Sequence, residues 1–308
     1  MVHVVLGLVR ASHPEPAVAV TTVSALLAWG VGHPPAGVAA VALTVLASQL
    51  AIGWVNDLLD ADRDTAVGRR DKPVAAGQVG RRTVGVAGVL AAVATPLPAL
   101  TLNPTAAFWA TVALVSALLY NWPLKSTPAS VLPYAVSFGA LPAFVVLGLP
   151  GTPTPPAWLV AAGALLGAGA HFANVLPDLA DDARTGVRGL PHRLGPAGTR
   201  TAAVLLLLAA TATLVLGPPG PPSWAGLGAI AVAAVVPPAV SYASRASAGS
   251  RPATAAPAVG GGTGVVGDAG TVRPDRPDRP DRPVAVFRAV MLVALIDVVL
   301  LVASGRVV

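Results

Sequence analysis

The chain has 308 residues, of which 54% are hydrophobic and only 11% are Asp, Glu, Lys or Arg, and its mean hydropathy is +0.71. Because soluble domains carry roughly 25% charged residues, this composition indicates a protein of the lipid bilayer. The absence of cysteine excludes disulfides, thiolate metal sites and a cysteine nucleophile. The net charge of +6 would favour nucleic acid as the partner of a soluble protein, but these basic residues stand in loops between apolar runs, so we expect no nucleic-acid partner.

Nine apolar segments are long enough to cross a bilayer as helices, which takes about 20 residues each. Their runs do not alternate between apolar and polar residues, and lipid requires backbone groups to be paired internally, so helices are favoured over strands. The stretch "MVHVVLGLVRASHPEP" before them is expected to lie along the membrane interface. We predict an all-α, polytopic membrane helical bundle of about nine transmembrane helices, at residues 16–32, 36–55, 83–102, 105–121, 129–149, 157–176, 201–217, 224–242 and 284–303.

Lysine and arginine are distributed unevenly between the loops. The loops with "GHPPAG", "TLNPT", "PGTPTPP" and "GPPGPPS" contain neither residue, whereas the other loops carry nearly all of them. Since cytoplasmic loops are enriched in Lys and Arg, we expect an internal N-terminus and an external C-terminus in the plasma membrane. The loops expected in the cytoplasm are 56–82, 122–128, 177–200 and 243–283.

Residues 244–283 form a low-complexity insert that ends in repeated Arg-Pro-Asp. Its Gly, Pro and Ala content cannot build a core, so we predict a disordered cytoplasmic linker. The alternative is a basic segment that touches anionic lipid, but the interleaved Asp residues halve its charge. The expected organisation is therefore a transmembrane domain at 1–243 with helices one to eight, the insert at 244–283, and a ninth helix with the C-terminus at 284–308.

The first polar motif is "GWVNDLLDADRD", where an apolar run ends. Asn56, Asp60 and Asp64 are spaced i, i+4 and i+8, so on a helix they lie along one face, which Asp57 adjoins. Carboxylates this close cannot all stay ionised unless cations neutralise them. Taken alone, the motif is also compatible with a solvated loop.

The second motif, "HFANVLPDLADD" at 171–182, closes the sixth predicted helix on the same side of the membrane. Asp178 and Asp182 are again i and i+4, Asp181 lies between them, and Asn174 stands one turn ahead. Oxygen ligands without His or Cys suit hard divalent ions, and Mg2+ prefers carboxylates together with substrate phosphates. The two motifs therefore predict a pair of Mg2+ ions that hold a diphosphate.

Basic residues follow both motifs and also stand between them, in "GRRDKPVAAGQVGRR", "YNWPLKS" and "ARTGVRGLPHRLG". Lys125 is nearly alone in its loop, which makes it the most specific candidate for a diphosphate contact. Most of the other basic residues are equally well explained as topology signals. His171 and His192 have no His or Cys partner at ligand spacing, so we do not expect them to bind metal.

These motifs resemble those of the UbiA superfamily of intramembrane prenyltransferases. "NDLLDADRD" is similar to the family's NDxxDxxxD pattern, and "DLADD" followed by "LPHRLG" resembles its second acidic region. "RRDKPVAAG" resembles its Arg-rich segment, and "YNWPLK" its Tyr-x-x-Pro-x-Lys element. The resemblance covers residues 10 to about 243 and the last helix. Two departures are Gly189, where the family commonly has Thr, and Lys72-Pro73-Val74 in place of Arg-Pro-Leu.

The resemblance implies transfer of a prenyl group from a prenyl diphosphate to a small-molecule acceptor, with Mg2+ as cofactor. It implies that the catalytic residues are Asp60, Asp64, Asp178, Asp182 and Lys125. It further implies a metal site built from Asn56, Asp57, Asp60, Asp64, Asp178, Asp181 and Asp182. The diphosphate contacts that it implies are Lys125, Asn56, Arg63, Arg70, Lys72, Tyr120 and Asn174.

Four aromatic residues near the predicted mouth, Trp54, Tyr120, Trp122 and Phe172, are candidates to stabilise a carbocation through their rings. The alternative for them is an aromatic belt at the membrane interface. We favour an aromatic, quinone-precursor-like acceptor, because such acceptors form the broadest part of the family. The identity of the acceptor, the prenyl chain length and the oligomeric state stay open.

Two other functions compete with this interpretation. Acidic residues in membrane proteins often mark ion pathways, so an ion-coupled transporter is possible. However, carriers place such residues near the bilayer midplane on interrupted helices, whereas both motifs stand at helix ends on one side. A membrane terpene cyclase would use the same metal chemistry without an acceptor.

Overall fold

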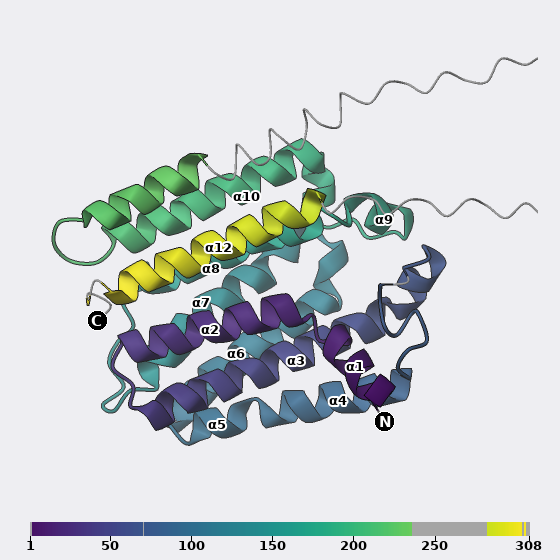
Figure 1. Cartoon of the computed structure of the whole chain (residues 1–308), viewed down its shortest axis with the longest axis horizontal. Coiled ribbons are helices and arrows are strands. Elements are labelled where there is room, and N and C mark those ends of the chain that lie inside the picture. Colours follow the sequence, from purple (N-terminus) through teal and green to yellow (C-terminus); the bar gives the residue numbers. More distant parts are fainter. Residues whose placement is uncertain (1, 70, 236–281, 304, 306–308) are drawn as a thin grey trace, which may run out of the picture.

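The structure is a computed structural model that describes residues 2–69, 71–235, 282–303 and 305, and over these ranges it contains helices and no strands (Figure 1). The helices are α1 Val2–Ala11, α2 Pro14–Gly30, α3 Pro35–Ala66, α4 Arg81–Ala94, α5 Pro96–Leu100, α6 Pro104–Asn121, α7 Leu132–Leu147, α8 Ala157–Val175, α9 Leu179–Arg184, α10 Leu190–Leu216, a helix at Trp224–Val235, and α12 Arg282–Ala303. Two 3-10 helices, η1 Leu124–Ser126 and η2 Pro128–Val131, join α6 to α7.

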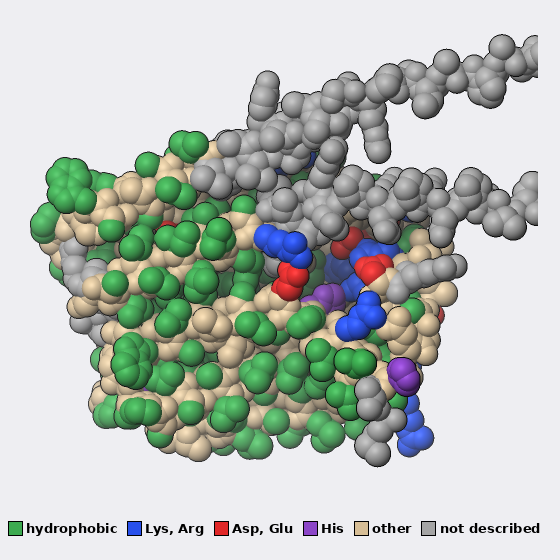
Figure 2. Space-filling view, viewed as in Figure 1, with side chains coloured by type: hydrophobic (Ala, Val, Ile, Leu, Met, Phe, Trp, Pro, Cys, Tyr) green, Lys and Arg blue, Asp and Glu red, His purple; other side chains and the backbone are tan. Residues whose placement is uncertain are grey.

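Six helical stretches in the described ranges are long and apolar enough to cross a membrane. This confirms the predicted all-α membrane bundle, while the count of nine spans stays a prediction. Most of the predicted insert at 244–283 lies outside the described residues. Figure 2 shows hydrophobic side chains spread over the long face of the bundle, as a lipid-facing surface requires, and charged side chains gathered near α1 and α9.

The helices form a closed bundle. Helix α8 packs against α7 and α10, α7 packs against α6, and α3 packs against α2 and α4. Helix α12 contacts α2 from the first half of the chain and α8 and α10 from the second half, so it joins the two halves of the bundle (Figure 1). The short helices α1 and α9 lie at the same end of the bundle, close to the end of α3. That end is therefore built by segments distant in sequence.

One predicted helix boundary at the acidic motifs differs from the structure. Helix α3 continues to Ala66, eleven residues beyond the expected end at 55, so the first motif occupies its last turns. No Pro or Gly interrupts the sequence between Val55 and Ala66, and the helix runs on past the apolar segment. In contrast, α8 ends at Val175, within one residue of the expected end at 176, because Pro177 has no N–H to continue the helical hydrogen bonds, and Asp178 stands at the N-cap position of the separate helix α9.

Two glycines of α8 allow α7 to approach closely. A Cβ atom on Gly163 would stand 2.5 Å from the Phe138 carbonyl oxygen, and one on Gly167 would stand 2.5 Å from the Phe138 Cβ atom. Real side chains do not tolerate such distances, so small residues are required at this crossing. Because Tyr134 and Phe138 sit on the opposing face of α7, the approach also fixes where these two rings lie.

We predict that Gly167→Ala destabilises the folded protein by about 1–3 kcal/mol, because the added methyl group must push α7 away. The matched control is Gly228→Ala, since a Cβ atom there meets no atom within 4 Å. Thermal unfolding in detergent measures both. A Gly167→Ala protein as stable as the control would contradict the proposed tight crossing.

Candidate active site

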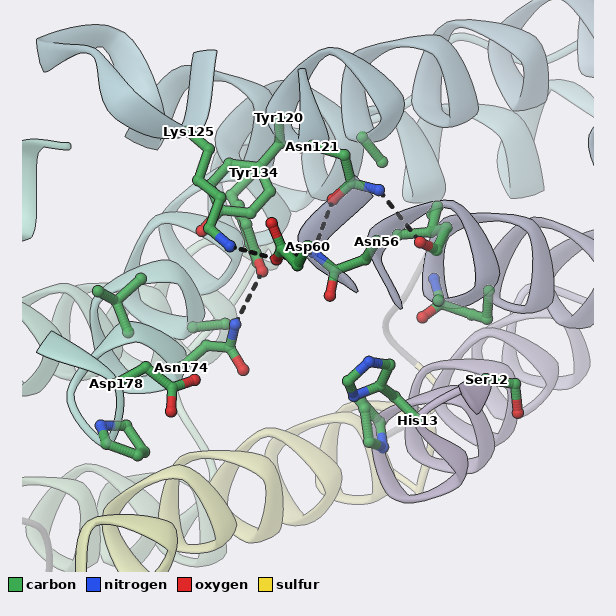
Figure 3. A pocket seen from close by; sticks show the side chains of 18 of the residues that line it. Ser12, His13, Asn56, Asp60, Tyr120, Asn121, Lys125, Tyr134, Asn174 and Asp178 are labelled. Atoms are coloured by element: carbon green, nitrogen blue, oxygen red, sulfur yellow. Dashed lines mark hydrogen bonds and ion pairs between the residues drawn. The ribbon is translucent and has the colours of Figure 1, made fainter. Parts of the chain in front are cut away.

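A cavity of about 450 Å³ opens at the end of the bundle where α1 and α9 lie (Figure 3). Residues from α1, α2, α3, α6, α7, α8, α9 and α12 line it, so both halves of the bundle contribute. Its mouth is polar and charged, whereas its deeper wall is mostly apolar and includes Val20, Ala113, Ala117, Phe138 and Leu141. The cavity therefore suits a ligand with a charged head and an apolar tail.

The first motif presents four side chains to this cavity, Asn56, Asp60, Arg63 and Asp64. Asp60 is only 7% exposed, and its charge is balanced by Lys125 Nζ at 2.5 Å and Arg63 Nη2 at 2.8 Å. Such a buried carboxylate is stable only when cations and hydrogen-bond donors surround it. The structure thus brings Asp60 and Lys125, 65 residues apart in sequence, into direct contact.

Asn56 and Asn121 join the ends of α3 and α6 beside Asp60 (Figure 3). The Asn56 side-chain amide donates to Asp60 Oδ2 at 3.2 Å and to Asn121 Oδ1 at 3.3 Å. Asn121 in turn donates to the carbonyl of Ile52 at 3.1 Å, which fixes its orientation. Asn121 was absent from the sequence-based site, although it stands in the quoted "YNWPLK" element.

Asp57 does not line the cavity. It is 1% exposed, accepts a hydrogen bond from the Val74 backbone N–H at 3.2 Å, and lies 3.6 Å from Lys72 Nζ. One residue along a helix rotates the side chain by about 100°, so Asp57 points away from the face shared by Asn56, Asp60 and Asp64. Asp57 anchors the loop after α3, and its predicted role as a metal ligand stays a prediction.

The loop after α3 also contacts the second motif. Arg69 Nη1 lies 2.8 Å from Asp178 Oδ1, and its other nitrogens bind Asp71, which lowers the pKa of the Asp71 carboxyl. This bridge ties the two acidic motifs together. Sequence analysis assigned Arg69 no specific role, and the adjacent Arg70, a predicted diphosphate contact, lies outside the described residues.

All three acids of the second motif, Asp178, Asp181 and Asp182, line the cavity. Burial raises the pKa of Asp182 to about 6, against the opposing effect of Lys125. Asp181 pairs with Arg184. Asn174, at the end of α8, donates to the Tyr134 hydroxyl at 3.3 Å and also lines the cavity.

Lys125 is held in place by the segment that follows the second motif. A Cβ atom on Gly189 would stand 2.5 Å from the Lys125 carbonyl oxygen, so this segment packs directly on the Lys125 loop. Ser130 Oγ accepts from the Leu190 N–H at 3.0 Å and lies 3.1 Å from His171 Nε2. Glycine at position 189, where the family commonly has Thr, therefore fits the structure, because a Thr side chain would have no room there.

Of the four predicted aromatic residues, only Tyr120 lines the cavity. Trp122 is 72% exposed, and Phe172 is buried in a separate apolar cluster. The Trp54 indole donates to the Leu8 carbonyl at 2.8 Å. Tyr134 and Phe138, which sequence analysis missed because they stand inside an apolar run, line the cavity instead. The rings of Tyr120 and Tyr134 meet edge to face with centroids 4.8 Å apart.

His13 is a further cavity residue without a sequence signal. It lies between α1 and α2, on the opposite side of the pocket from Lys125 (Figure 3). Burial, helped by the positive charge of Lys72, lowers the pKa of His13 to about 3, so its imidazole is neutral at physiological pH. Lys72 itself, a predicted diphosphate contact, lies between Asp57 and His13.

No three acidic or histidine side chains of the described chain converge as a ready metal site. Instead, Lys125 and Arg63 pair with Asp60, and Arg69 pairs with Asp178. The donor set nevertheless fits a hard cation. Asp64 lines the cavity, and its Oδ2 atom is buried without a hydrogen-bond partner in the structure. Carboxylate and amide oxygens, with no sulfur ligand, are the groups that Mg2+ prefers.

The fold resembles that of several solved structures. A UbiA homolog from Archaeoglobus fulgidus, bound to GPP and Mg2+, has a TM-score of 0.65 at 13% identity, over 96% of this chain and 99% of its own. The apo UbiA homolog from Aeropyrum pernix K1 has a TM-score of 0.65 at 19% identity, over 94% and 96%. A digeranylgeranylglyceryl phosphate synthase has a TM-score of 0.62 at 14% identity, over 99% of both chains.

None of the curated proteins compared with the chain matches it. Residues 17–260, however, match the sequence model of the UbiA prenyltransferase family. This range includes both acidic motifs, Lys125 and most of the helices that surround the cavity. The chain therefore belongs to the UbiA prenyltransferase family and is an integral membrane protein.

Proposed function

We propose that this protein transfers a prenyl group from a prenyl diphosphate to a small-molecule acceptor, with Mg2+-assisted release of pyrophosphate. The observation that carries the proposal is one cavity in which both acidic motifs and Lys125 meet at the mouth while apolar side chains line the interior. A prenyl diphosphate has the same two parts, a highly charged head and a hydrocarbon tail. The A. fulgidus neighbour bound to GPP and Mg2+ adds support.

The oxygen ligands that line the mouth would hold the metal: Asn56, Asp60, Asp64, Asp178, Asp181 and Asp182. Bound there, Mg2+ supplies positive charge that stabilises the departing pyrophosphate. Asp57 lies behind this face, where it supports the loop that carries Lys72.

In the proposed reaction, the cations at the cavity mouth have the diphosphate as a second partner. Lys125 and Arg63 now neutralise Asp60, and Arg69 neutralises Asp178. When metal neutralises the carboxylates, these side chains are free to donate to the phosphate oxygens of the substrate. The same cations would thus balance the carboxylates before binding and stabilise the leaving group afterwards.

The interior of the cavity would enclose the prenyl tail and exclude water from the allylic carbon. Breaking its carbon–oxygen bond produces a carbocation, which water would quench. The faces and edges of Tyr120 and Tyr134 lie beside the mouth, where aromatic rings stabilise cationic character. A nucleophilic acceptor then forms the new bond at this carbon and loses a proton.

We propose an aromatic, quinone-precursor-like compound as the acceptor, because such acceptors form the broadest part of the family. A glycerol phosphate lipid is the contrasting acceptor, because one structural neighbour is a digeranylgeranylglyceryl phosphate synthase. An ion-coupled transporter has less support, since both acidic motifs stand at one end of the bundle beside a matching set of cations. Consumption of prenyl diphosphate without any acceptor would instead favour a terpene cyclase.

We further propose that the protein lies in the plasma membrane with the cavity mouth facing the cytoplasm. The support is the concentration of Lys and Arg at that end of the bundle, since positively charged loops stay inside (Figure 2).

This orientation predicts that single cysteines at Thr154 and Ala183 are labelled from opposite sides of the membrane. Both positions are exposed, and the chain has no cysteine of its own to give background. An impermeant maleimide applied to intact cells should reach Thr154→Cys only, whereas inverted vesicles should expose Ala183→Cys. Labelling of both from the same side would contradict the topology.

The proposed chemistry predicts that Asp60→Asn and Asp182→Asn each fold normally but lose most turnover, roughly a hundredfold or more, because a carboxylate that neutralises the metal is gone. The double variant should be little slower than either single variant, because residues that act as a unit are not additive. Prenyl transfer from a radiolabelled diphosphate in membranes, with and without EDTA, measures this.

The matched control is Asp62→Asn, from the same motif. Asp62 is 84% exposed and pairs with Arg81 on the outer face of α3, so this variant should keep wild-type turnover. Full activity of Asp182→Asn with unchanged Mg2+ dependence would separate the two motifs and remove the basis of the proposal.

A further inference from the structure

His13 occupies a strained turn at the wall of the cavity. Its backbone has φ 53° and ψ 68°, the left-handed region, which residues other than Gly and Asn rarely adopt. Strained backbone of this kind persists only where surrounding structure holds it, and it is concentrated at functional sites. The turn joins α1 to α2 and brings the imidazole into the pocket lining (Figure 3).

The turn is held by direct packing on α3. A Cβ atom on Gly53 would stand 2.6 Å from the Ser12 carbonyl oxygen and 2.9 Å from the Ser12 Cα atom. Ser12 is buried, and its hydroxyl donates to the Val9 carbonyl at 2.8 Å. Because Gly53 precedes Asn56 by less than one helical turn, the His13 turn is fixed against the first acidic motif.

The imidazole contacts Lys72, whose Nζ lies 3.2 Å from His13 Nε2. An ammonium group has only donors, so Nε2 must offer its lone pair and the proton of the neutral ring must be on Nδ1. On its other side the ammonium lies 3.6 Å from Asp57 Oδ1. Asp57 stands behind the cavity wall and His13 in it, so the two acceptors hold Lys72 from opposite directions.

A neutral acceptor has a specific consequence at this place. A carboxylate in the position of His13 would add a second negative partner beside Asp57, whereas a neutral imidazole fixes the ammonium without cancelling more of its charge. The other charged groups near His13 are Asp60, Arg69 and Lys125. Asp60 pairs with Lys125 and Arg69 pairs with Asp178, rather than with the imidazole.

We propose that His13 is a positioning residue that holds the Lys72 ammonium in the cavity, where Lys72 binds the diphosphate of the prenyl donor. This inference rests on the proposed function. It makes the α1–α2 turn, which precedes the first predicted span, part of the substrate-binding machinery. It also assigns a purpose to the strained backbone and to Gly53.

The test compares two amide substitutions of different length. His13→Asn suits left-handed backbone but is too short to reach Lys72, whereas His13→Gln reaches farther and offers an acceptor oxygen. In the purified full chain with Mg2+, calorimetry should show pyrophosphate binding weakened about tenfold by His13→Asn, the loss of one charge-assisted hydrogen bond. The KM for prenyl diphosphate should rise similarly, with a smaller change in kcat, and His13→Gln should restore most of the binding.

A double-mutant cycle with Lys72→Met separates positioning from general support of the fold. If His13 acts through Lys72, His13→Asn should weaken pyrophosphate binding no further in the Lys72→Met background. Fully additive effects would overturn the proposal. So would a His13→Gln protein that binds pyrophosphate normally but has lost turnover, because that result would make His13 a proton acceptor.

The wild-type protein distinguishes this inference from the proposed function. If wild type neither binds pyrophosphate with Mg2+ nor consumes prenyl diphosphate, the proposed function fails. If wild type does both and His13→Asn binds pyrophosphate equally well, only the role of His13 fails.

Discussion

The placement of carboxylates where an apolar bundle meets water is the constraint on which this structure depends. A buried charge is tolerated only when an opposite charge and hydrogen bonds compensate it. Three of the acids are therefore met by cations from other segments: Asp60 by Lys125 of η1, Asp178 by Arg69, and the buried Asp57 by Lys72. These pairs, rather than apolar packing alone, bring the ends of α3, α6 and α8 to one place.

The same constraint connects stability with function. Ion pairs between these side chains can exchange partners when a metal and a diphosphate enter with their own opposite charges. The exchange creates no uncompensated charge, because the carboxylates receive metal while the cations receive phosphate. In the proposed reaction, the apolar interior lined by Ala113, Phe138 and Leu141 would keep the reacting carbon away from water. A charged mouth and a dry interior thus arise from one architecture.

The sequence predicted what depends on spacing along a helix. Asn56, Asp60 and Asp64 share a face because the helical period places them there, and Lys125 stood out because its loop has no other cation. The helical period also explains why the Asp57 side chain points away from this face, although Asp57 belongs to the same motif. His13, Tyr134 and Arg69 could not be found this way, since their positions depend on contacts between distant segments, such as the approach of Ser12 to Gly53. The end of α3 also differs from the predicted one, because the helix continues through the acidic motif beyond residue 55.

The most direct test of the central claim, that two distant motifs and Lys125 form one metal–diphosphate site, is a structure of the full chain in lipid nanodiscs with Mn2+ and an uncleavable prenyl thiolodiphosphate. The account predicts anomalous metal density between the carboxylates of Asp60 and Asp64 and those of Asp178 and Asp182. It also predicts that Lys125 Nζ has left Asp60 for a phosphate oxygen. A diphosphate bound outside this cavity, or one bound with the Lys125–Asp60 and Arg69–Asp178 pairs intact and no metal between the motifs, would contradict it.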